Sequence, residues 1–496
     1  MALPDGFDPE RALLPGLPPC EGGRMSDTLY NAGYGLHYLD GQGMELTRGF
    51  RGSPFVMLQR MQRFTMSGYE VTSMPDKPSV TMTDGRLRID AWLEDQRLHS
   101  RVIRVDGLPQ DPPTWVRTVT DTTAEAFDRY LTLLAENGYT REWARALDGN
   151  RFVSLTGHGR RLYGALYPAQ GLYRWIDDPV SVPLTDFCTP GGEQDFLLCQ
   201  FGLHHSLMVD GISADCGMLY FLRLKDGSLF VIDGGEYEQA TDAAVADALA
   251  LMHRLTGTAE GQRIPIAAWF CTHAHEDHTD FFAKLLRFHH DEMDVQRVIF
   301  NFPTMDRYTY PLALHQAIDR LIRYFPNVRY LKAHTGQQFS LGGVTFDILQ
   351  THEDGTGPQG EEQLGDFNDT SVVLKATADG ASFLCTGDIS WRAEAPLLAR
   401  FSPETLRCGA VQAAHHMINQ LDHLYGVAAP EYMLVPQSHA ATEDGNIRYR
   451  TLRSLLPEEN LLFTSAGTHI LAATEGRWQL REVLPSVQEP YDGSFL

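Results

Sequence analysis

The sequence predicts two domains, a smaller α+β domain at residues 1–190 and a layered α/β domain at residues 191–496. Three observations support this division. One helical pattern is followed by strand-like runs before residue 177, whereas strand-like and helix-like segments interleave after residue 191. Between them lies the proline- and glycine-rich stretch 177–192. A chain of 496 residues is also too long for one ordinary domain.

In the N-terminal domain, alternating runs at 79–83 and 87–92 are split by Asp84-Gly85, which is typical of a β-hairpin. A helical pattern begins after Thr120 and ends at Asn137-Gly138, as expected for a helix C-terminus. Strand-like runs follow near residues 152, 162 and 172. A packing or dimerisation module is the first interpretation, and a substrate-selecting role is the alternative.

In the C-terminal domain, strands and helices alternate. Lys225-Asp-Gly-Ser joins two apolar runs as a hairpin turn. Apolar periodicity predicts helices at 240–255, 277–288 and 310–324. Short apolar runs predict strands at 264–271, 298–300, 346–349, 372–375, 383–385 and 432–435. Several hairpins interrupt the alternation, so a layered α/β domain is favoured over a barrel.

Composition limits the class of protein. Hydrophobic residues make up 43% of the chain and charged residues 21%, which is normal for a globular protein with a large core. The net charge is −23, from 41 Lys and Arg against 64 Asp and Glu. This excess opposes non-specific binding to nucleic acid, because phosphate contacts need a basic surface. The net charge does not exclude a local basic groove, so a nucleic-acid substrate remains possible.

The cysteines and the N-terminus indicate the compartment. The seven cysteines are scattered and never form a CxxC pair, as in proteins with free thiols in a reducing environment. Residues 1–23 carry acids and prolines where a signal peptide needs an apolar run, and no stretch has the apolar length of a membrane helix. We therefore expect a cytoplasmic protein without a membrane partner. Association into a homo-oligomer through the N-terminal domain is a further possibility.

The strongest chemical signal is Thr272-His-Ala-His-Glu-Asp-His278, directly after a buried strand and before a helix. His273 and His275 are two residues apart in an extended loop, so both can face one point. Asp277 and His278 lie where the helix begins and can face a second point nearby. Imidazole and carboxylate are the ligands of zinc and similar cations. A solvated histidine-rich loop is the alternative interpretation.

Other ligands must come from elsewhere in the chain. Asp388 follows the apolar strand 382–385 beside Gly387, where a carboxylate can bridge two cations. His415 and His416 end a strand-like run, and Asp233 with two glycines ends another. Taken singly, each of these is more often a turn, a surface residue or a core residue than a ligand.

Together, the order Asp-Gly-Gly, His-x-His-x-Asp-His, Gly-Asp and His-His resembles the metallo-β-lactamase superfamily, over roughly residues 195–480. The resemblance is greatest to the hydrolase domain of bacterial competence DNA-uptake channels. It is carried by Asn368-Asp-Thr-Ser-Val-Val-Leu, Phe383-Leu-Cys-Thr-Gly-Asp388 and Glu431-Tyr-Met-Leu-Val-Pro-Gln-Ser-His439. It implies a four-layer αββα sandwich at 191–496. The resemblance does not extend to residues 1–190, whose role the sequence leaves open.

The resemblance also implies roles for single residues. It implies that the site binds two divalent cations. Zinc is the first expectation and manganese is the alternative. His273 and His275 would hold the first metal, whereas Asp277, His278 and His415 would hold the second, and Asp388 would bridge both. Asp233 would fix the histidine loop by hydrogen bonds from outside the ligand set. Asp277 would also act in catalysis, and His416 and His439 are candidates for substrate contact or proton transfer.

One position departs from the family pattern. Most members have a histidine just before the Gly-Asp strand, and this chain has Asn368 there. Asn368 itself, His334 or His352 could take the place of the missing ligand. Alternatively, Asn368 only caps the turn before the strand at 372–375, since Asn readily bonds to nearby backbone.

The ligand pattern predicts a metal-dependent hydrolase that uses a metal-bound hydroxide, because a bound divalent cation lowers the pKa of water to about 7. The competence-domain resemblance favours a small phosphodiester or nucleotide-like substrate. Another ester, a lactone or a thioester is the alternative substrate. The alternative class of function is a degenerate member of the family that binds a partner and has no catalytic activity. Cys271 and Cys385 lie in apolar strands and are expected to be inert core thiols.

Overall fold

The computed structural model describes residues 24–31, 44–49, 70–73, 79–83, 87–94, 97–104, 114–177, 188–204, 208–209, 212–213, 217–236, 239–302, 328–355, 367–419, 421–443 and 452–485. The predicted helix at 310–324 lies outside these residues. No described helix is long and apolar enough to cross a membrane.

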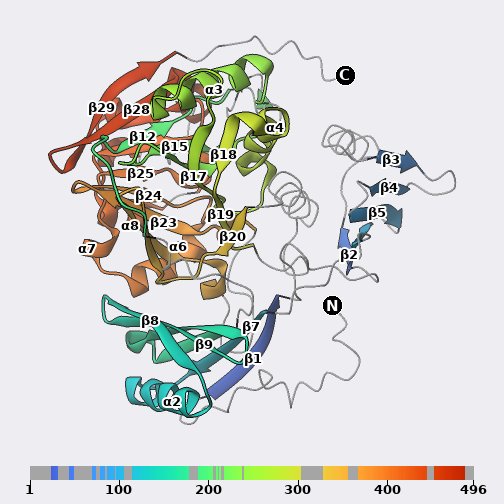
Figure 1. The fold of residues 1–496 in the computed structure, drawn as a ribbon, viewed down its shortest axis with the longest axis vertical. Helices are drawn as coiled ribbons and strands as arrows, with labels where there is room; N and C mark the ends of the chain where they lie inside the picture. Colours follow the sequence, from blue (N-terminus) through green and yellow to red (C-terminus); the bar gives the residue numbers. More distant parts are fainter. Residues whose placement is uncertain are drawn as a thin grey trace.

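Two sheets packed face to face form the largest body of the molecule (Figure 1). The first runs in the order β20-β19-β17-β16-β15-β12-β28-β29, and β18 pairs with β17. Its strands are β12 (Leu197–Gln200), β15 (Leu219–Arg223), β16 (Leu229–Asp233), β17 (Ile264–Phe270), β18 (Met293–Val295), β19 (Arg297–Phe300), β20 (Arg329–Lys332), β28 (Thr468–Thr474) and β29 (Arg477–Leu484).

The second sheet runs in the order β21-β22-β23-β24-β25-β26-β27. Its strands are β21 (Gln338–Leu341), β22 (Val344–Gln350), β23 (Val373–Ala378), β24 (Ala381–Cys385), β25 (Ala410–Gln412), β26 (Tyr432–Val435) and β27 (Leu461–Phe463). The strands β24 to β27 are parallel, whereas β21 to β24 pair antiparallel. The parallel strands therefore end at one common edge of the sheet.

Helices cover both outer faces. The first sheet packs on α3 (Asp242–Thr256) and α4 (Asp280–His289), and the second on α6 (Trp391–Arg400) and α8 (Asp422–Ala428). The short helices α7 (Pro403–Leu406) and α9 (His439–Glu443) complete this part. Alternate residues along β12 face the two sides: Leu197 packs toward the helices and Leu198 into the core between the sheets. The arrangement is the expected four-layer αββα sandwich.

A third sheet, in the order β1-β7-β11-β10-β9-β8, lies below the sandwich in Figure 1. Its strands are β1 (Arg24–Asn31), β7 (Thr114–Thr120), β8 (Thr140–Leu147), β9 (Asn150–Gly157), β10 (Arg160–Tyr167) and β11 (Leu172–Asp177). One face packs on α2 (Ala124–Glu136), whose N-cap Thr123 accepts a hydrogen bond from Ala126 N. The helix and the strands at 152, 162 and 172 agree with the sequence prediction.

A further sheet, in the order β2-β6-β5-β4-β3, contains the predicted hairpin at 79–92. Its strands are β2 (Met44–Gly49), β3 (Glu70–Ser73), β4 (Ser79–Thr83), β5 (Leu87–Glu94) and β6 (Arg97–Arg104). The short strands β13 (Met208–Val209) and β14 (Ile212–Ser213) pair with each other. The domain division at residue 190 stays a prediction.

The α2-bearing sheet shares buried core with the sandwich. Phe152, Tyr167 and Leu172 belong to the same apolar cluster as α6 and α8 of the sandwich. Polar contacts cross the same boundary: Tyr167 donates to Asp354 Oδ1 (2.9 Å), and Asn150 Nδ2 donates to the carbonyl of Arg400 (2.6 Å). This sheet is therefore packed directly onto the sandwich.

Candidate metal centre

The histidine loop is held in place by Asp233. This residue ends β16 with a left-handed backbone (φ 57°) and is fully buried. Its carboxylate accepts from Thr272 N (2.7 Å) and Thr272 Oγ1 (2.8 Å), and it pairs with His278 Nδ1 (2.7 Å). Asp233 thus fixes the start of the loop and one imidazole, the position that the sequence analysis gave it.

The two glycines after Asp233 support the helix that follows the loop. The carbonyl of Gly235 accepts from Asp280 N (2.9 Å) and Phe281 N (3.1 Å), and that of Gly234 accepts from Phe282 N (2.7 Å). These N–H groups belong to the first turn of α4, where no helical partner exists. The Asp-Gly-Gly motif therefore docks both the histidine loop and the start of α4.

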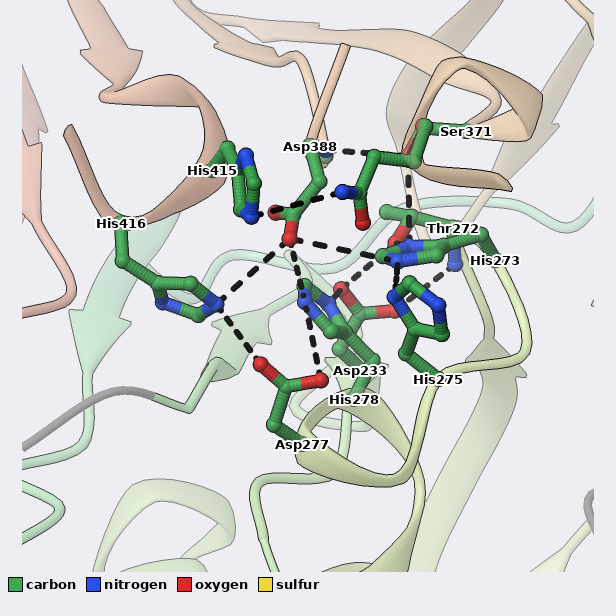
Figure 2. A network of polar contacts seen from close by, with 12 residues as sticks. Asp233, Thr272, His273, His275, Asp277, His278, Ser371, Asp388, His415 and His416 are labelled. Atoms are coloured by element: carbon green, nitrogen blue, oxygen red, sulfur yellow. Dashed lines mark hydrogen bonds and ion pairs between the residues drawn. The ribbon is translucent and has the colours of Figure 1, made fainter. Parts of the chain in front are cut away.

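Four side chains converge beside this loop (Figure 2). Asp277, His278, Asp388 and His416 each offer a ligand atom, and these atoms all lie within 4.8 Å of one another. Asp388 Oδ2 lies 3.1 Å from His278 Nε2 and 3.5 Å from His416 Nε2, and Asp277 Oδ2 lies 2.9 Å from His416 Nε2. Among the residues that the structure describes, no other group of His, Cys, Asp and Glu converges in this way.

His273 and His275 lie at the other end of the same cluster. His273 Nε2 is 3.0 Å from His275 Nδ1 and 3.9 Å from Asp388 Oδ2. The ring of His275 packs on Phe367, with 4.8 Å between centroids. Asp388 thus lies between the pair His273–His275 and the pair Asp277–His278.

Histidines and carboxylates of opposite charge lie close together in the cluster and shift one another's pKa values. Burial lowers the pKa of His278, but the carboxylates of Asp388, Asp277 and Asp233 outweigh it and raise this pKa well above its usual value. The pKa of His416 is also raised, because Asp388 and Asp277 outweigh burial. Burial raises the pKa of Asp388, but His278, His416 and His415 hold it well below its usual value. The histidines and the carboxylates of the cluster therefore shift one another's pKa values in opposite directions.

The two histidines of the first pair behave differently. Burial, together with His278 and His275, holds the pKa of His273 well below its usual value, and burial lowers the pKa of His275. Both rings are therefore neutral near pH 7, the protonation state in which imidazole binds a metal.

The donor set fits divalent cations. It combines imidazole nitrogens and carboxylate oxygens, the usual ligands of zinc and related metals. Asp388 is 1% exposed, yet no hydrogen bond from a described residue reaches its Oδ1. A buried carboxylate oxygen without a donor is unfavourable unless a cation satisfies it. This orphaned oxygen and the convergent ligands support the binding of a divalent metal.

No family model matches this sequence, and no curated protein does either. Several solved structures are similar in fold. The metallo-β-lactamase fold protein YhfI from Bacillus subtilis is similar over 56% of this chain and 100% of its own, with 11% identity and a TM-score of 0.36. CmlA, a diiron β-hydroxylase from Streptomyces venezuelae, is similar over 84% and 82%, with 12% identity and a TM-score of 0.33.

The short form of human tRNase Z is similar over 48% of this chain and 90% of its own, with 11% identity and a TM-score of 0.27. Likenesses at this level transfer no activity, so the fold assignment depends on the layers and strand order of the chain itself. The sandwich has helices outside two facing sheets, with the histidine loop after an inner strand. This is the metallo-β-lactamase fold.

The structure differs from the expected ligand set of the metallo-β-lactamase fold at the histidine pair. His415 was expected to bind the second metal and His416 to contact substrate. Instead, His416 faces Asp277 and Asp388, and His415 Nε2 lies 3.4 Å from Asn368 Nδ2. The physical reason is the backbone: His415, His416 and Met417 all have left-handed conformations (φ 50°, 49° and 65°), which turn the two rings to different sides.

The remaining candidates lie outside the cluster. His334 pairs with Glu353 (2.9 Å) and His352 with Asn301 (3.1 Å), in a network beside the α2-bearing sheet. His439 packs on Phe463 and lies 3.6 Å from Glu458. Cys271 and Cys385 are buried, and burial raises the pKa of both thiols well above the usual value, as expected for inert core residues.

Two supporting residues have no role predicted from the sequence. Ser371 Oγ contacts Asp388 N (2.9 Å) and His273 Nδ1 (3.2 Å), so it joins two ligand motifs. Gln412 accepts from Thr386 N (2.9 Å) and donates to the carbonyls of Gly387 (3.0 Å) and Ala413 (2.6 Å), so it ties the Asp388 loop to the loop carrying the histidine pair. Their only signal in the sequence is a polar residue within a few positions of a ligand motif.

Proposed function

We propose that this protein is a metal-dependent hydrolase that acts on a phosphodiester or nucleotide-like small molecule, with two divalent cations, zinc or manganese, at the cluster around Asp388. The observation that carries the metal is the convergence of Asp277, His278, Asp388 and His416 within 4.8 Å. The choice of a phosphodiester rests on the resemblance between the sequence motifs and those of the competence hydrolase domain. An ester, lactone or thioester is the alternative substrate class.

Bound cations would supply Lewis acidity, lower the pKa of water and offset negative charge in the transition state. The residues of the protein orient the imidazole rings of the site. Asp233 holds His278 through Nδ1, which leaves Nε2 directed at Asp388. The carbonyl of Pro436 lies 3.1 Å from His416 Nδ1 and can accept a hydrogen bond from it, which leaves Nε2 directed at Asp277 and Asp388.

Within the converging group of four, Asp277 is the residue open to solvent, with 24% of its side chain exposed, whereas Asp388 and His278 are almost fully buried. Water and substrate would therefore approach from the side of Asp277. Once metal is bound, a carboxylate at this entrance can accept a proton from water, which is the catalytic role proposed for Asp277.

The test is a panel of chromogenic substrates with the metal-loaded protein. We expect hydrolysis of bis-p-nitrophenyl phosphate to exceed that of lactones and carboxylic esters. Asp388→Ala and His278→Ala should abolish turnover, whereas His423→Ala, at a side chain that is 86% exposed, should retain it. A lactone-dominated profile would contradict the phosphodiester assignment, and a chain that binds no metal after loading would contradict the hydrolase proposal itself.

A further inference from the structure

The unanswered feature of the metal centre is the position where the fold family usually has a histidine and this chain has Asn368. On one side of Asp388, His273 and His275 offer two nitrogens only 3.0 Å apart. A catalytic zinc in proteins usually has three protein ligands. With Asp388 shared between the two centres, one further donor on this side would match the other side, which has Asp277, His278 and His416.

The structure brings one imidazole to that position. His415 Nε2 lies 3.4 Å from the side-chain amide of Asn368, and His415 is half-buried. Its other ring nitrogen, Nδ1, is buried with no hydrogen-bond partner among the described residues. His334 and His352 are engaged with Glu353 and Asn301. Of these three histidines, His415 is therefore the one that contacts Asn368.

The backbone shows how adjacent histidines serve different places. A left-handed conformation costs roughly 1–2 kcal/mol for a residue other than glycine, and His415, His416 and Met417 adopt it consecutively. The strained turn is held by His415 N to the carbonyl of Gly387 (3.2 Å) and by Gln437 Nε2 to the carbonyl of His416 (2.6 Å). Such strain persists where the surroundings enforce it and is typical of functional sites.

The strain has a geometric result. The ring centroids of His415 and His416 lie 6.1 Å apart, and in Figure 2 the His416 ring faces Asp277 while the His415 ring lies beside Asp388. Each ring of the pair thus has a different set of neighbours around one shared carboxylate.

We propose that His415 replaces the missing family histidine and completes the centre of His273 and His275, while His416 completes the centre of Asp277 and His278. This inference rests on the proposed two-metal function. Asn368 then orients His415 through its amide and is not the replacing ligand. The ligand pattern becomes two imidazoles from one loop, one from a His-His pair and the shared Asp388.

The experiment measures metal stoichiometry by elemental analysis, and the visible spectrum of the cobalt-loaded protein, for the wild type and single variants. His415→Ala should lose one of the two metals and keep the cobalt bands of the other. His416→Ala should lose the opposite set of bands. Asn368→Ala should keep both metals, and the matched surface control His423→Ala should equal the wild type.

A rescue variant tests the same position directly. Asn368→His restores the family histidine beside His415, so Asn368→His with His415→Ala should regain the lost metal. His415→Gly separates ligand loss from backbone strain, because glycine accepts φ 50° without strain. It should unfold at a temperature no lower than metal-free wild type and still lack one metal.

The outcomes separate the two proposals. A wild type that binds less than one metal per chain after loading would overturn the hydrolase proposal. A wild type with two metals and a His415→Gly variant that also keeps two would overturn the role of His415 alone. Loss of a metal in Asn368→Ala, with both metals kept in His415→Gly, would assign the position to Asn368.

Discussion

At the scale of single residues, the hydroxyl of Ser371 helps to decide which nitrogen of His273 faces Asp388, together with that of Thr272, which also lies 3.2 Å from His273 Nδ1. The Ser371 hydroxyl can satisfy all three of its neighbours at once. It accepts from Asp388 N (2.9 Å) and from His273 Nδ1 (3.2 Å), and it donates to the carbonyl of Asn368 (2.8 Å). His273 then carries its proton on Nδ1 and presents the lone pair of Nε2 toward Asp388.

Ser371→Ala should therefore weaken metal binding about 10- to 100-fold, the usual effect of removing a group that orients a ligand. The dissociation constant can be measured by competition with a chromophoric chelator. Ser340→Ala is the control and should bind metal like the wild type, because the Ser340 hydroxyl donates to the nearby carbonyl of Val344 (3.2 Å) and to no other group among the described residues. Equal affinity in both variants would show that Ser371 does not orient His273.

Metal binding should release protons. The pKa values of His278 and His416 are raised in the metal-free protein, because the carboxylates of Asp388 and Asp277 outweigh burial, so protons compete with a cation for both rings. Affinity should rise with pH through the neutral range, because fewer protons then compete. Asp277 and Asp388 add no competition there, because their pKa values are lowered, mainly by His278 against the effect of burial.

Calorimetric titrations at pH 7 in two buffers of different ionisation enthalpy measure this release. We expect about two protons released when both centres fill. The same measurement on His416→Ala should show a smaller release. Identical heats in the two buffers would mean that the rings are neutral before metal arrives.

The sequence predicts much of the site, for a physical reason. His273, His275, Asp277 and His278 lie on one short loop, so their spacing alone brings them together. The choice between His415 and His416 cannot be made from spacing, because adjacent residues differ only in backbone conformation. A left-handed turn at three residues other than glycine has no sequence signature, so the two roles become visible only in the structure.

At the scale of elements, the turn between β24 and α6 depends on Gly387. Its φ is 55°, and a Cβ atom there would lie 2.6 Å from Ser371 Cβ and 3.1 Å from Thr272 Cβ. These three residues belong to three different loops of the site. A side chain at Gly387 would therefore push apart the loops that carry Asp388 and the first histidines.

Gly387→Ala should lower the free energy of unfolding by about 2–4 kcal/mol, from backbone strain and overpacking together. Gly476→Ala is the matched control: its φ is 81°, but nothing lies within 4 Å of the added atom. It should cost only the strain, about 1–2 kcal/mol. Urea unfolding of the metal-free proteins compares the two, and equal losses would argue against crowding at Gly387.

The elements that the sequence predicts well are the buried ones. The strands β17, β24 and β26 are continuous apolar runs, and the α2 and α3 helices have polar N-caps and apolar faces. The sequence pattern does not single out α6, where Pro396 interrupts the helical signal. It also misses β29, in which exposed residues alternate with buried or half-buried ones at the edge of the sheet.

At the scale of the whole molecule, the α2-bearing sheet is fixed to the sandwich through Asp354. This buried carboxylate contacts Arg400 NH1 (3.0 Å), Arg174 NH1 (3.4 Å) and the hydroxyl of Tyr167 (2.9 Å). Arg174 and Tyr167 belong to that sheet, whereas Arg400 ends α6. The contact argues for a module packed rigidly on the sandwich, although its role in substrate selection or dimerisation stays a prediction.

Asp354→Ala should destabilise the protein by about 3–5 kcal/mol, because it leaves two buried guanidinium groups without their carboxylate. Asp128→Ala removes an exposed partner of Arg151 and should cost no more than about 1 kcal/mol. Thermal and urea unfolding of both variants make the comparison. Similar losses would indicate that the Asp354 contact does not hold the sheet in place.

The distance along the chain between the ligands has a consequence for how the protein acquires its metal during folding. Asp277 and His416 touch, yet they are 139 residues apart in sequence. Contacts between such distant residues form late, because closing a long loop costs entropy before the contact is made. Metal should therefore leave the refolding rate nearly unchanged and slow unfolding instead, so that the cation stabilises the protein kinetically after it has folded.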